Sequence, residues 1–160
     1  MFSFKKKVAV SEYCNAKFNH LFSKERETIW LKLIEECNDP ALKSTNKIYY
    51  FNNMKAIYLQ LLGIGVTKNS SLDAGSDFHS DWNHYSKANN LMEIDRLYSQ
   101  YNQAFASSYV DGIKEMTAFF FNNLTDSEVS PETFELFYSG FYGVLSKIFL
   151  EFKKIKLTAK

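Results

Sequence analysis

The sequence predicts an all-α fold, a compact antiparallel helical bundle of about five to seven helices with no sheet. Only two prolines and six glycines interrupt its 160 residues. Apolar residues recur three and four positions apart along the whole chain, which is the period of a helix rather than of a strand. With 46% hydrophobic and 23% charged residues, the composition is typical of a globular domain. We therefore expect a single helical domain over residues 1–160, with a short flexible N-terminus at 1–8.

The first two helices are expected to follow one another closely. Ser11 is a candidate cap for a helix that runs to about Phe22, and Ser23 is a candidate cap for the next. The second helix should end at residues 38–40, Asn-Asp-Pro, because the residue before a proline avoids the helical region. Its expected apolar stripe comprises Ile29, Trp30, Leu33, Ile34 and Cys37.

A third helix and then a mobile loop are expected in the middle of the chain. The helix follows the polar turn at 43–46, and Gly63 and Gly65 are expected to fray its end. Residues 67–76 show little periodicity and are rich in Ser, Asn, Asp and Gly. That composition predicts a mobile loop.

The segment 88–124 has helical periodicity, and two readings of it stay open. Ser108 with Asp111 is suited to cap a new helix, whereas Gly112 is also compatible with one continuous helix. The clearest helix start in the chain comes later, at residues 130–132, where a serine, a proline and a glutamate follow one another. A last helix is expected from there to about Ile155, with lysines near its end, where cations complement the helix dipole.

Charge and hydropathy exclude several classes of partner. A formal net charge of +1 produces no field that would gather a nucleic acid, so we expect no nucleic-acid partner. The most apolar stretch, 57–66, is far shorter than a bilayer requires, so we expect no membrane span. No signal-peptide pattern follows the basic residues at 5–7, and we therefore expect a cytoplasmic protein.

The segment "GSDFHSDWNHY", residues 75–85, contains two of the three histidines of the chain. Read as a strand, it would place Asp77, His79 and Asp81 on one face. Read as a helix, it places Asp77, Asp81 and His84 at i, i+4 and i+7, beside an apolar stripe with the same spacing. The helix accounts for both stripes, so the candidate metal ligands are Asp77, Asp81 and His84, and a solvated helix face is the alternative.

Catalytic and cofactor motifs are missing from the sequence. The segment 73–84 has neither the glycine nor the final acid that a calcium loop requires, and no zinc, phosphate-loop or dinucleotide motif occurs. No globin pattern surrounds any histidine, so haem is not expected. Cys14 and Cys37 lack metal or redox spacing and are expected to be reduced thiols. We expect no cofactor, and catalysis has the least support.

Aromatic content is the most unusual property of the composition, with fifteen Phe and ten Tyr. The runs 49–51 and 119–121 point around most of a helix and therefore need a second surface besides one core. That surface is another helix of the same bundle, a second copy of the protein, or a ligand. The last helix offers small residues that permit close approach, flanked by aromatics. The candidate interface residues are Ser139, Gly140, Phe141, Tyr142 and Gly143.

These observations favour a binding function over a catalytic one. The sequence predicts a non-catalytic helical interaction domain that associates with itself, as a homodimer, or with a protein partner through aromatic surface. Close packing within one chain is the alternative explanation of the small residues in the last helix. The alternative function is a helical bundle that binds an apolar small molecule or a divalent metal.

Overall fold

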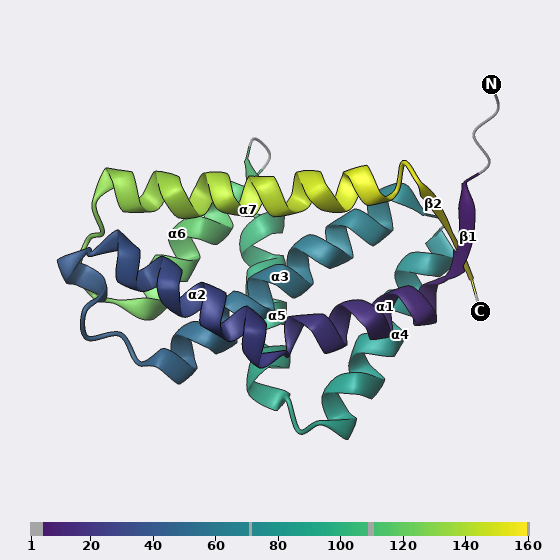
Figure 1. Cartoon of the computed structure of the whole chain (residues 1–160), viewed down its shortest axis with the longest axis horizontal. Helices are drawn as coiled ribbons and strands as arrows, with labels where there is room; N and C mark the ends of the chain where they lie inside the picture. The colour runs from purple at the N-terminus through teal and green to yellow at the C-terminus, as the bar shows by residue number, and fades with distance from the viewer. Residues whose placement is uncertain (1–4, 71, 109–110, 160) are drawn as a thin grey trace.

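The all-α prediction is confirmed by the computed structural model, which describes residues 5–70, 72–108 and 111–159. Within these residues the chain forms seven α-helices, one short 3-10 helix at Pro40–Leu42 and two short strands (Figure 1). The helices are α1 Val10–Leu21, α2 Lys24–Cys37, α3 Lys47–Asn69, α4 Leu72–Ala88, α5 Met92–Ala106, α6 Gly112–Leu124 and α7 Pro131–Glu151. The strands are β1 Lys6–Ala9 and β2 Ile155–Thr158.

Helix α3 occupies the centre of the molecule and is buried on nearly every side. It packs against α5, α7, α4, α6 and α2. In Figure 1, α7 runs along one long side of the molecule, and α1 and α2 follow one another below it, with α2 crossing over α3 in this view. The chain direction of α7 in this view is opposite to that of α1 and α2.

The expected fraying of the third helix at Gly63 and Gly65 is wrong, because α3 continues to Asn69. Both glycines are sites of close packing. A Cβ atom on Gly63 would lie 3.1 Å from a ring carbon of Phe78 in α4, and one on Gly65 would lie 2.2 Å from Cγ2 of Ile148 in α7. The glycines therefore allow two other helices to approach the backbone of α3.

The predicted mobile loop at 67–76 is also wrong for the residues that the structure describes. Helix α3 runs to Asn69 and α4 begins at Leu72, while residue 71 lies outside the described residues. The side chain of Asn69 donates to the carbonyl of Gly65 at 2.7 Å, and Ala74 is fully buried. Burial and side-chain bonding therefore outweigh the weak helix propensity of this polar stretch.

Helix starts agree with the sequence at three of four expected positions. Ser23 and Ser130 each accept a hydrogen bond from the backbone N–H three residues later, and Asp111 caps α6 in the same way. The segment 88–124 is thus two helices. Ser11 is not a cap, because α1 begins at Val10, ahead of it.

A two-stranded parallel sheet joins the two ends of the described chain, so the prediction of no sheet is wrong. Strand β1 pairs with β2 in a register that places Lys6 beside Ile155 and Val8 beside Leu157 (Figure 1). Residues 6–8 of the expected flexible N-terminus are consequently part of a strand, while residues 1–4 lie outside the described part of the chain. Helix α7 ends at Glu151, so Ile155 belongs to β2 and not to the last helix.

The two aromatic runs find their second surface inside the same chain. Tyr50 is buried and donates its hydroxyl hydrogen to the carbonyl of Trp30 in α2 at 2.8 Å. In the other run, Phe120 is fully buried, and the ring of Phe119 lies edge-on to Tyr101 with centroids 5.1 Å apart. These rings therefore fill the core and require no partner.

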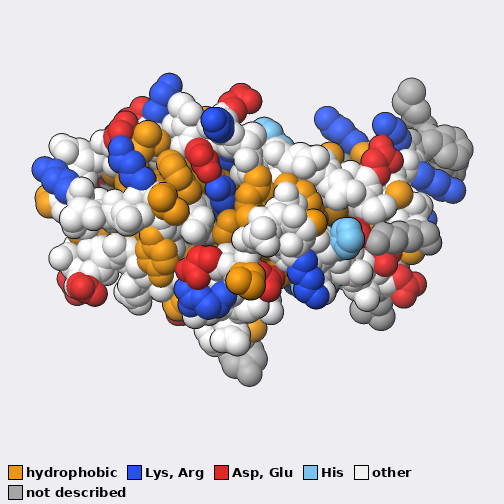
Figure 2. Space-filling model, turned by 90° about the horizontal axis from the view of Figure 1, so that it is seen from below, with side chains coloured by type: hydrophobic (Ala, Val, Ile, Leu, Met, Phe, Trp, Pro, Cys, Tyr) orange, Lys and Arg blue, Asp and Glu red, His pale blue; other side chains and the backbone are white. Residues whose placement is uncertain are grey.

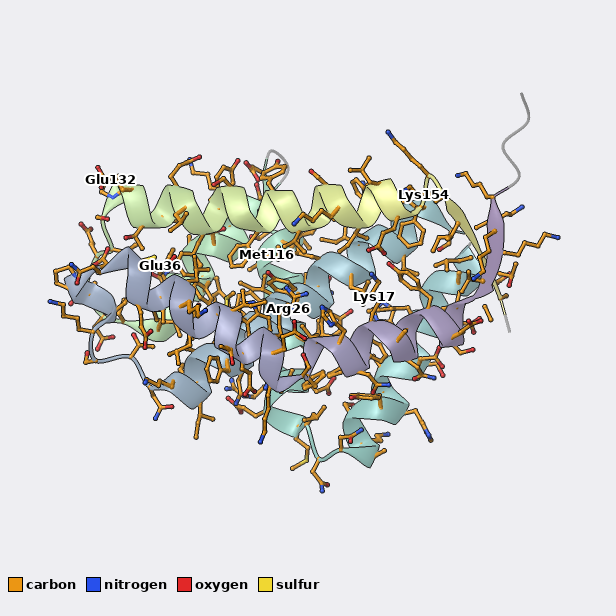
Figure 3. The ribbon with its side chains drawn as sticks, viewed as in Figure 1. Lys17, Arg26, Glu36, Met116, Glu132 and Lys154 are labelled. Atoms are coloured by element: carbon orange, nitrogen blue, oxygen red, sulfur yellow. The ribbon has the colours of Figure 1, made fainter. Side chains whose placement is uncertain are left out.

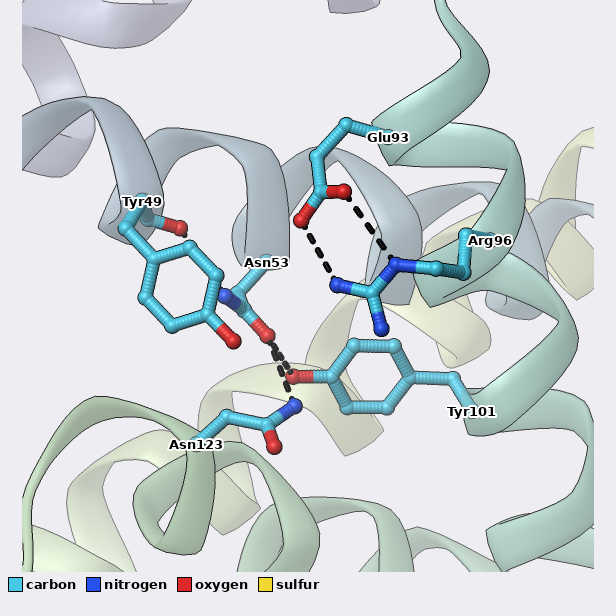
Figure 4. A network of polar contacts seen from close by, with 6 residues as sticks. All are labelled: Tyr49, Asn53, Glu93, Arg96, Tyr101 and Asn123. Atoms are coloured by element: carbon cyan, nitrogen blue, oxygen red, sulfur yellow. Dashed lines mark hydrogen bonds and ion pairs between the residues drawn. The ribbon is translucent and has the colours of Figure 1, made fainter.

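A buried polar network connects α3, α5 and α6 (Figure 4). The hydroxyl of Tyr101 donates to Oδ1 of Asn53 at 2.6 Å, and Nδ2 of Asn123 donates to the same oxygen at 3.1 Å. The amide nitrogen of Asn53 donates to the carbonyl four residues earlier at 2.9 Å. Each polar group of the Asn53 side chain thus has a partner, which offsets the cost of its burial.

Candidate functional site

The histidine-containing segment lies in α4, as its helical reading predicts. Phe78 and Trp82 face the core, and Nε1 of Trp82 donates to Oδ1 of Asp95 in α5 at 2.7 Å. Outside this stripe, His79 lies beside the hydroxyl of Tyr98, with Nδ1 and the oxygen 3.4 Å apart. The apolar stripe therefore anchors α4 on the bundle, and both histidines of the segment are exposed.

The candidate ligands Asp77, Asp81 and His84 do not assemble into a metal centre in the structure. Among the described residues, no three His, Cys, Asp or Glu side chains are grouped so that they would hold a metal ion. His84 is exposed, and the two aspartates are half-buried. One carboxylate oxygen of Asp81 is buried, so this part of α4 is not a fully solvated helix face.

The outward side of α7 carries no charge from position 136 to position 146. We call it the α7 outer face and define it as Leu136, Ser139, Gly140, Tyr142, Gly143, Ser146 and Leu150, all of them exposed. Leu136, Tyr142 and Leu150 expose 45%, 42% and 53% of their area. No charged residue occurs between positions 136 and 146. A helix side of three turns without a charge is unusual on a surface in contact with water.

Two glycines lie at the middle of the α7 outer face. A Cβ atom added to Gly140 or Gly143 would meet nothing within 4 Å. Neither glycine has a positive φ angle, so neither is needed for a turn. Nothing within the described chain therefore explains a glycine at these positions.

The predicted interface is split by the orientation of α7. Ser139, Gly140, Tyr142 and Gly143 lie on the outer face, whereas Phe141 is only 2% exposed and packs against Phe120, with ring centroids 5.8 Å apart. Phe141 is therefore a core residue and is not part of a surface. At 100° per residue, five consecutive residues cannot share one side of a helix.

Charged residues flank the α7 outer face with opposite signs at its two ends. Glu132 and Glu135 lie in the first turns of α7, and Lys147, Lys153 and Lys154 lie in or just after its last turns. Figure 3 labels Glu132 and Lys154 at these opposite ends. The face thus has an acidic end, an uncharged middle and a basic end.

Exposed hydrophobic side chains elsewhere do not form a comparable surface. Ile29, Ile48 and Met92 are exposed, and each belongs to a different helix. On the face that Figure 2 shows, hydrophobic side chains reach the surface in several separate places, with charged side chains between them. Single exposed apolar residues of this kind are normal.

A cavity of about 220 Å³ lies where α1 ends and α2 begins, between these helices and the second half of α7. The apolar part of its lining comes from α1, α3 and α7. The apolar lining comprises Leu21, Tyr58, Leu62, Val144 and Ile148. The volume is below the usual range for drug-sized ligands, so only a small molecule would fit.

The remaining lining of the cavity is mostly basic. Lys17, Arg26 and Lys147 line it together with His20 and a single carboxylate, that of Glu151. Lys17 and Arg26 lie on the side of α1 and α2 that faces α7 (Figure 3). Three permanent cations thus share the cavity with one anion, which leaves an excess of positive charge.

The one carboxylate of the cavity already has two partners. Lys17 contacts Oε1 of Glu151 at 2.6 Å, and the hydroxyl of Tyr13 donates to Oε2 at 2.9 Å. Burial, and then the charge of Glu151, raise the pKa of the Tyr13 phenol well above its ordinary value, so this hydroxyl remains a donor. The charge of Glu151 is therefore directed at Lys17 and not at the other two cations.

The guanidinium of Arg26 has partners for only part of its donors. One terminal nitrogen of its guanidinium contacts Nε2 of His20 at 2.5 Å, and its Cζ lies 5.6 Å from the ring centroid of Tyr58. Its Nε atom is buried and has no hydrogen-bond partner among the described residues. No carboxylate of the described chain forms an ion pair with Arg26 or Lys147.

Comparison with known proteins gives no match: no family model, no curated protein and no solved structure resembles this chain. No described helix is both long and apolar enough to cross a bilayer. Two features of the molecule are therefore candidates for function, the α7 outer face and the cavity. The sequence indicated most of the first but not the second, whose lining comes from residues far apart in the chain.

Proposed function

We propose that this protein is a non-catalytic interaction domain whose copies pair through the α7 outer face. The observation that carries this proposal is the open space in front of Gly140 and Gly143. Around them lie three exposed large apolar side chains and no charge. A second helix placed on this face would cover all of these residues together.

The two glycines lower the stability of a single copy of the chain. A glycine in the middle of a helix lowers stability by about 1 kcal/mol relative to alanine. Gly63, Gly65 and Gly112 offset this cost by close packing, since an added Cβ would lie within 3.1 Å of a neighbouring atom. No neighbouring atom lies close to Gly140 or Gly143 in this way, and helix α7 of a second copy would provide such neighbours.

The charges at the ends of the face favour a second copy of this chain as the occupant. Glu135 and Lys147 lie about six residues on either side of the midpoint between Gly140 and Gly143. In an antiparallel pair that crosses at this midpoint, Glu135 of each copy therefore lies at about the same height along the helix axis as Lys147 of the other. The face is thus complementary to itself across a two-fold axis, which is the symmetry of most homodimers.

The expected association is weak enough to depend on protein concentration. One helix from each copy buries less area than a standard interface, and a small interface of this kind is typical of transient pairing. We expect monomers and dimers in exchange between about 1 µM and about 1 mM.

The substitution Gly143→Arg tests the proposal. It places a long charged side chain at the centre of the face, so dimers should be lost across the whole concentration range. Helix α7 of the monomer should be stabilised, because arginine has a much higher helix propensity than glycine. Sedimentation velocity over a dilution series measures the association, and circular dichroism confirms the fold. Gln103→Arg, at an exposed position of α5, is the control with the same change of charge.

Three results would count against the proposal. The wild-type protein would remain a monomer at the highest concentration, Gly143→Arg would dimerise like the wild type, or Gln103→Arg would abolish dimers equally. The antiparallel order has its own test. Glu135→Lys alone should weaken pairing, and the double variant Glu135→Lys/Lys147→Glu should restore it, because each reversed charge again faces an opposite one.

A further inference from the structure

We propose that the cavity between α1, α2, α3 and α7 binds a small amphipathic carboxylate, that is, a carboxylic acid with a short apolar body. The body would lie against Leu21, Leu62 and Ile148, and the carboxylate would bind to Arg26. This site does not include the α7 outer face, but it shares Lys147 with the proposed pairing of two copies.

The free hydrogen-bonding capacity of Arg26 indicates an anionic head group. A guanidinium has only donors, so the Nε2 atom of His20 acts as the acceptor in their contact. This leaves the other terminal nitrogen, at the open end of the guanidinium, without a carboxylate in the described chain, whereas the Nε atom is buried and out of reach of a ligand. A carboxylate presents two oxygens that match the fork of a guanidinium, and such bidentate pairs are among the strongest hydrogen-bonded contacts.

The charge balance of the cavity also favours an anion. Lys17 and Glu151 neutralise one another at 2.6 Å. Arg26 and Lys147 then remain as two cations beside an apolar interior. Cations held together near a surface of low dielectric attract an anion more strongly than the same groups in open water.

The walls and the volume restrict the rest of the ligand. Five apolar side chains line the cavity, so a fully hydrated ion such as phosphate would leave them without a partner. The volume of about 220 Å³ admits a short chain or a single ring and excludes a long lipid. Octanoate has both an apolar chain and a carboxylate, and it is therefore the probe.

Calorimetric titration of the wild-type chain with octanoate is the first part of the test. Octan-1-ol has the same chain without the charge, and inorganic phosphate has charge without the chain. The expected result is octanoate binding at least about tenfold tighter than either compound. Equal binding of octanoate and octan-1-ol would overturn the assignment of Arg26, and tighter binding of phosphate would overturn the amphipathic ligand.

Variants locate the binding within the molecule. Arg26→Gln should weaken octanoate binding about tenfold or more, whereas Lys24→Gln, two residues away and exposed, should leave it within about twofold. Val144→Phe fills the cavity without altering its charge and should also reduce binding. If Arg26→Gln does not fold, Val144→Phe still decides the location. Unchanged affinity in both folded variants, or in Val144→Phe alone, would overturn the proposal.

Discussion

At single positions, glycine has two opposite consequences in this chain. Gly65 lies against Cγ2 of Ile148, where a Cβ atom would come within 2.2 Å. Gly140 also lies inside an α-helix, but a Cβ atom added to it would meet nothing within 4 Å. The same substitution, glycine to alanine, is therefore expected to act in opposite directions at the two sites.

Gly65→Ala should lower the free energy of unfolding by about 1–3 kcal/mol, because the added methyl group forces α3 and α7 apart. Gly140→Ala, the matched control, should raise it by up to about 1 kcal/mol through helix propensity alone. Urea denaturation of dilute protein measures both values without a contribution from association. A stabilising Gly65→Ala would show that the close contact between α3 and α7 is not a constraint.

A single aspartate connects the end of α2 with the start of α7. Asp39 is buried, and its two carboxylate oxygens accept hydrogen bonds from the N–H of Ala41 at 2.9 Å and of Ser130 at 2.8 Å. The N–H of Ser130 is the largest influence on the pKa of this carboxyl and lowers it, although burial acts in the opposite direction. The charged form of Asp39 is therefore the form that stabilises the fold.

The pH dependence of Asp39 follows from the sign of this shift. Because its pKa is lower in the folded state, the carboxylate contributes its full stability above the unfolded-state pKa of about 3.9. That contribution is lost as the pH falls through the lower, folded-state pKa. Asp39→Asn should thus reduce the free energy of unfolding by about 1–3 kcal/mol near neutral pH and by less in acid.

Denaturant titrations at about pH 7 and at progressively lower pH measure this difference. Asp126→Asn, at an exposed position, is the control and should change stability by less than about 0.5 kcal/mol. A difference between wild type and Asp39→Asn that stayed constant down to strongly acidic pH would contradict the role of the charge.

Among the elements, the helices were predictable and the strands were not. Cap residues and apolar spacing are local signals, and they located the starts of α2 and α7 at Ser23 and Ser130. The pairing of β1 with β2 joins residues about 150 positions apart, and neither four-residue strand has a pattern of its own. The start of α4 could not be predicted for a related reason, because the burial of Ala74 depends on contacts with residues distant in the sequence.

The strand pair should be necessary for order at the N-terminal end of the described chain. Deleting residues 155–160 removes all of β2, including the buried side chain of Leu157. Hydrogen exchange of the amides of residues 6–9 should then approach that of an unstructured peptide, while α3 keeps its protection. Deleting only residues 159 and 160 should leave the protection of β1 intact. Equal protection of β1 in both truncated proteins would contradict the pairing.

For the whole molecule, the sequence indicated the proposed pairing surface better than the cavity. Small residues close together in one helix pointed to the α7 outer face, although periodicity alone did not place Phe141 in the core. The cavity has no sequence signal, because Lys17, Arg26, Tyr58 and Lys147 come from four helices. The metal hypothesis shows the opposite limit, since helical spacing put three polar residues on one side of α4, while the described residues contain no group of three such side chains that could hold a metal ion.

Disulfide cross-linking at the centre of the α7 outer face is the measurement that tests the pairing of two copies most directly. A cysteine in place of Gly140 would lie opposite Gly143 of the second copy and close to the proposed two-fold axis, and hence close to its own counterpart. The background Cys37→Ser removes the more accessible native thiol, since Cys14 is buried. We predict that mild oxidation of Gly140→Cys gives covalent dimers far faster than Gln103→Cys does, and that adding Gly143→Arg prevents them. Equal rates for Gly140→Cys and Gln103→Cys would contradict the account.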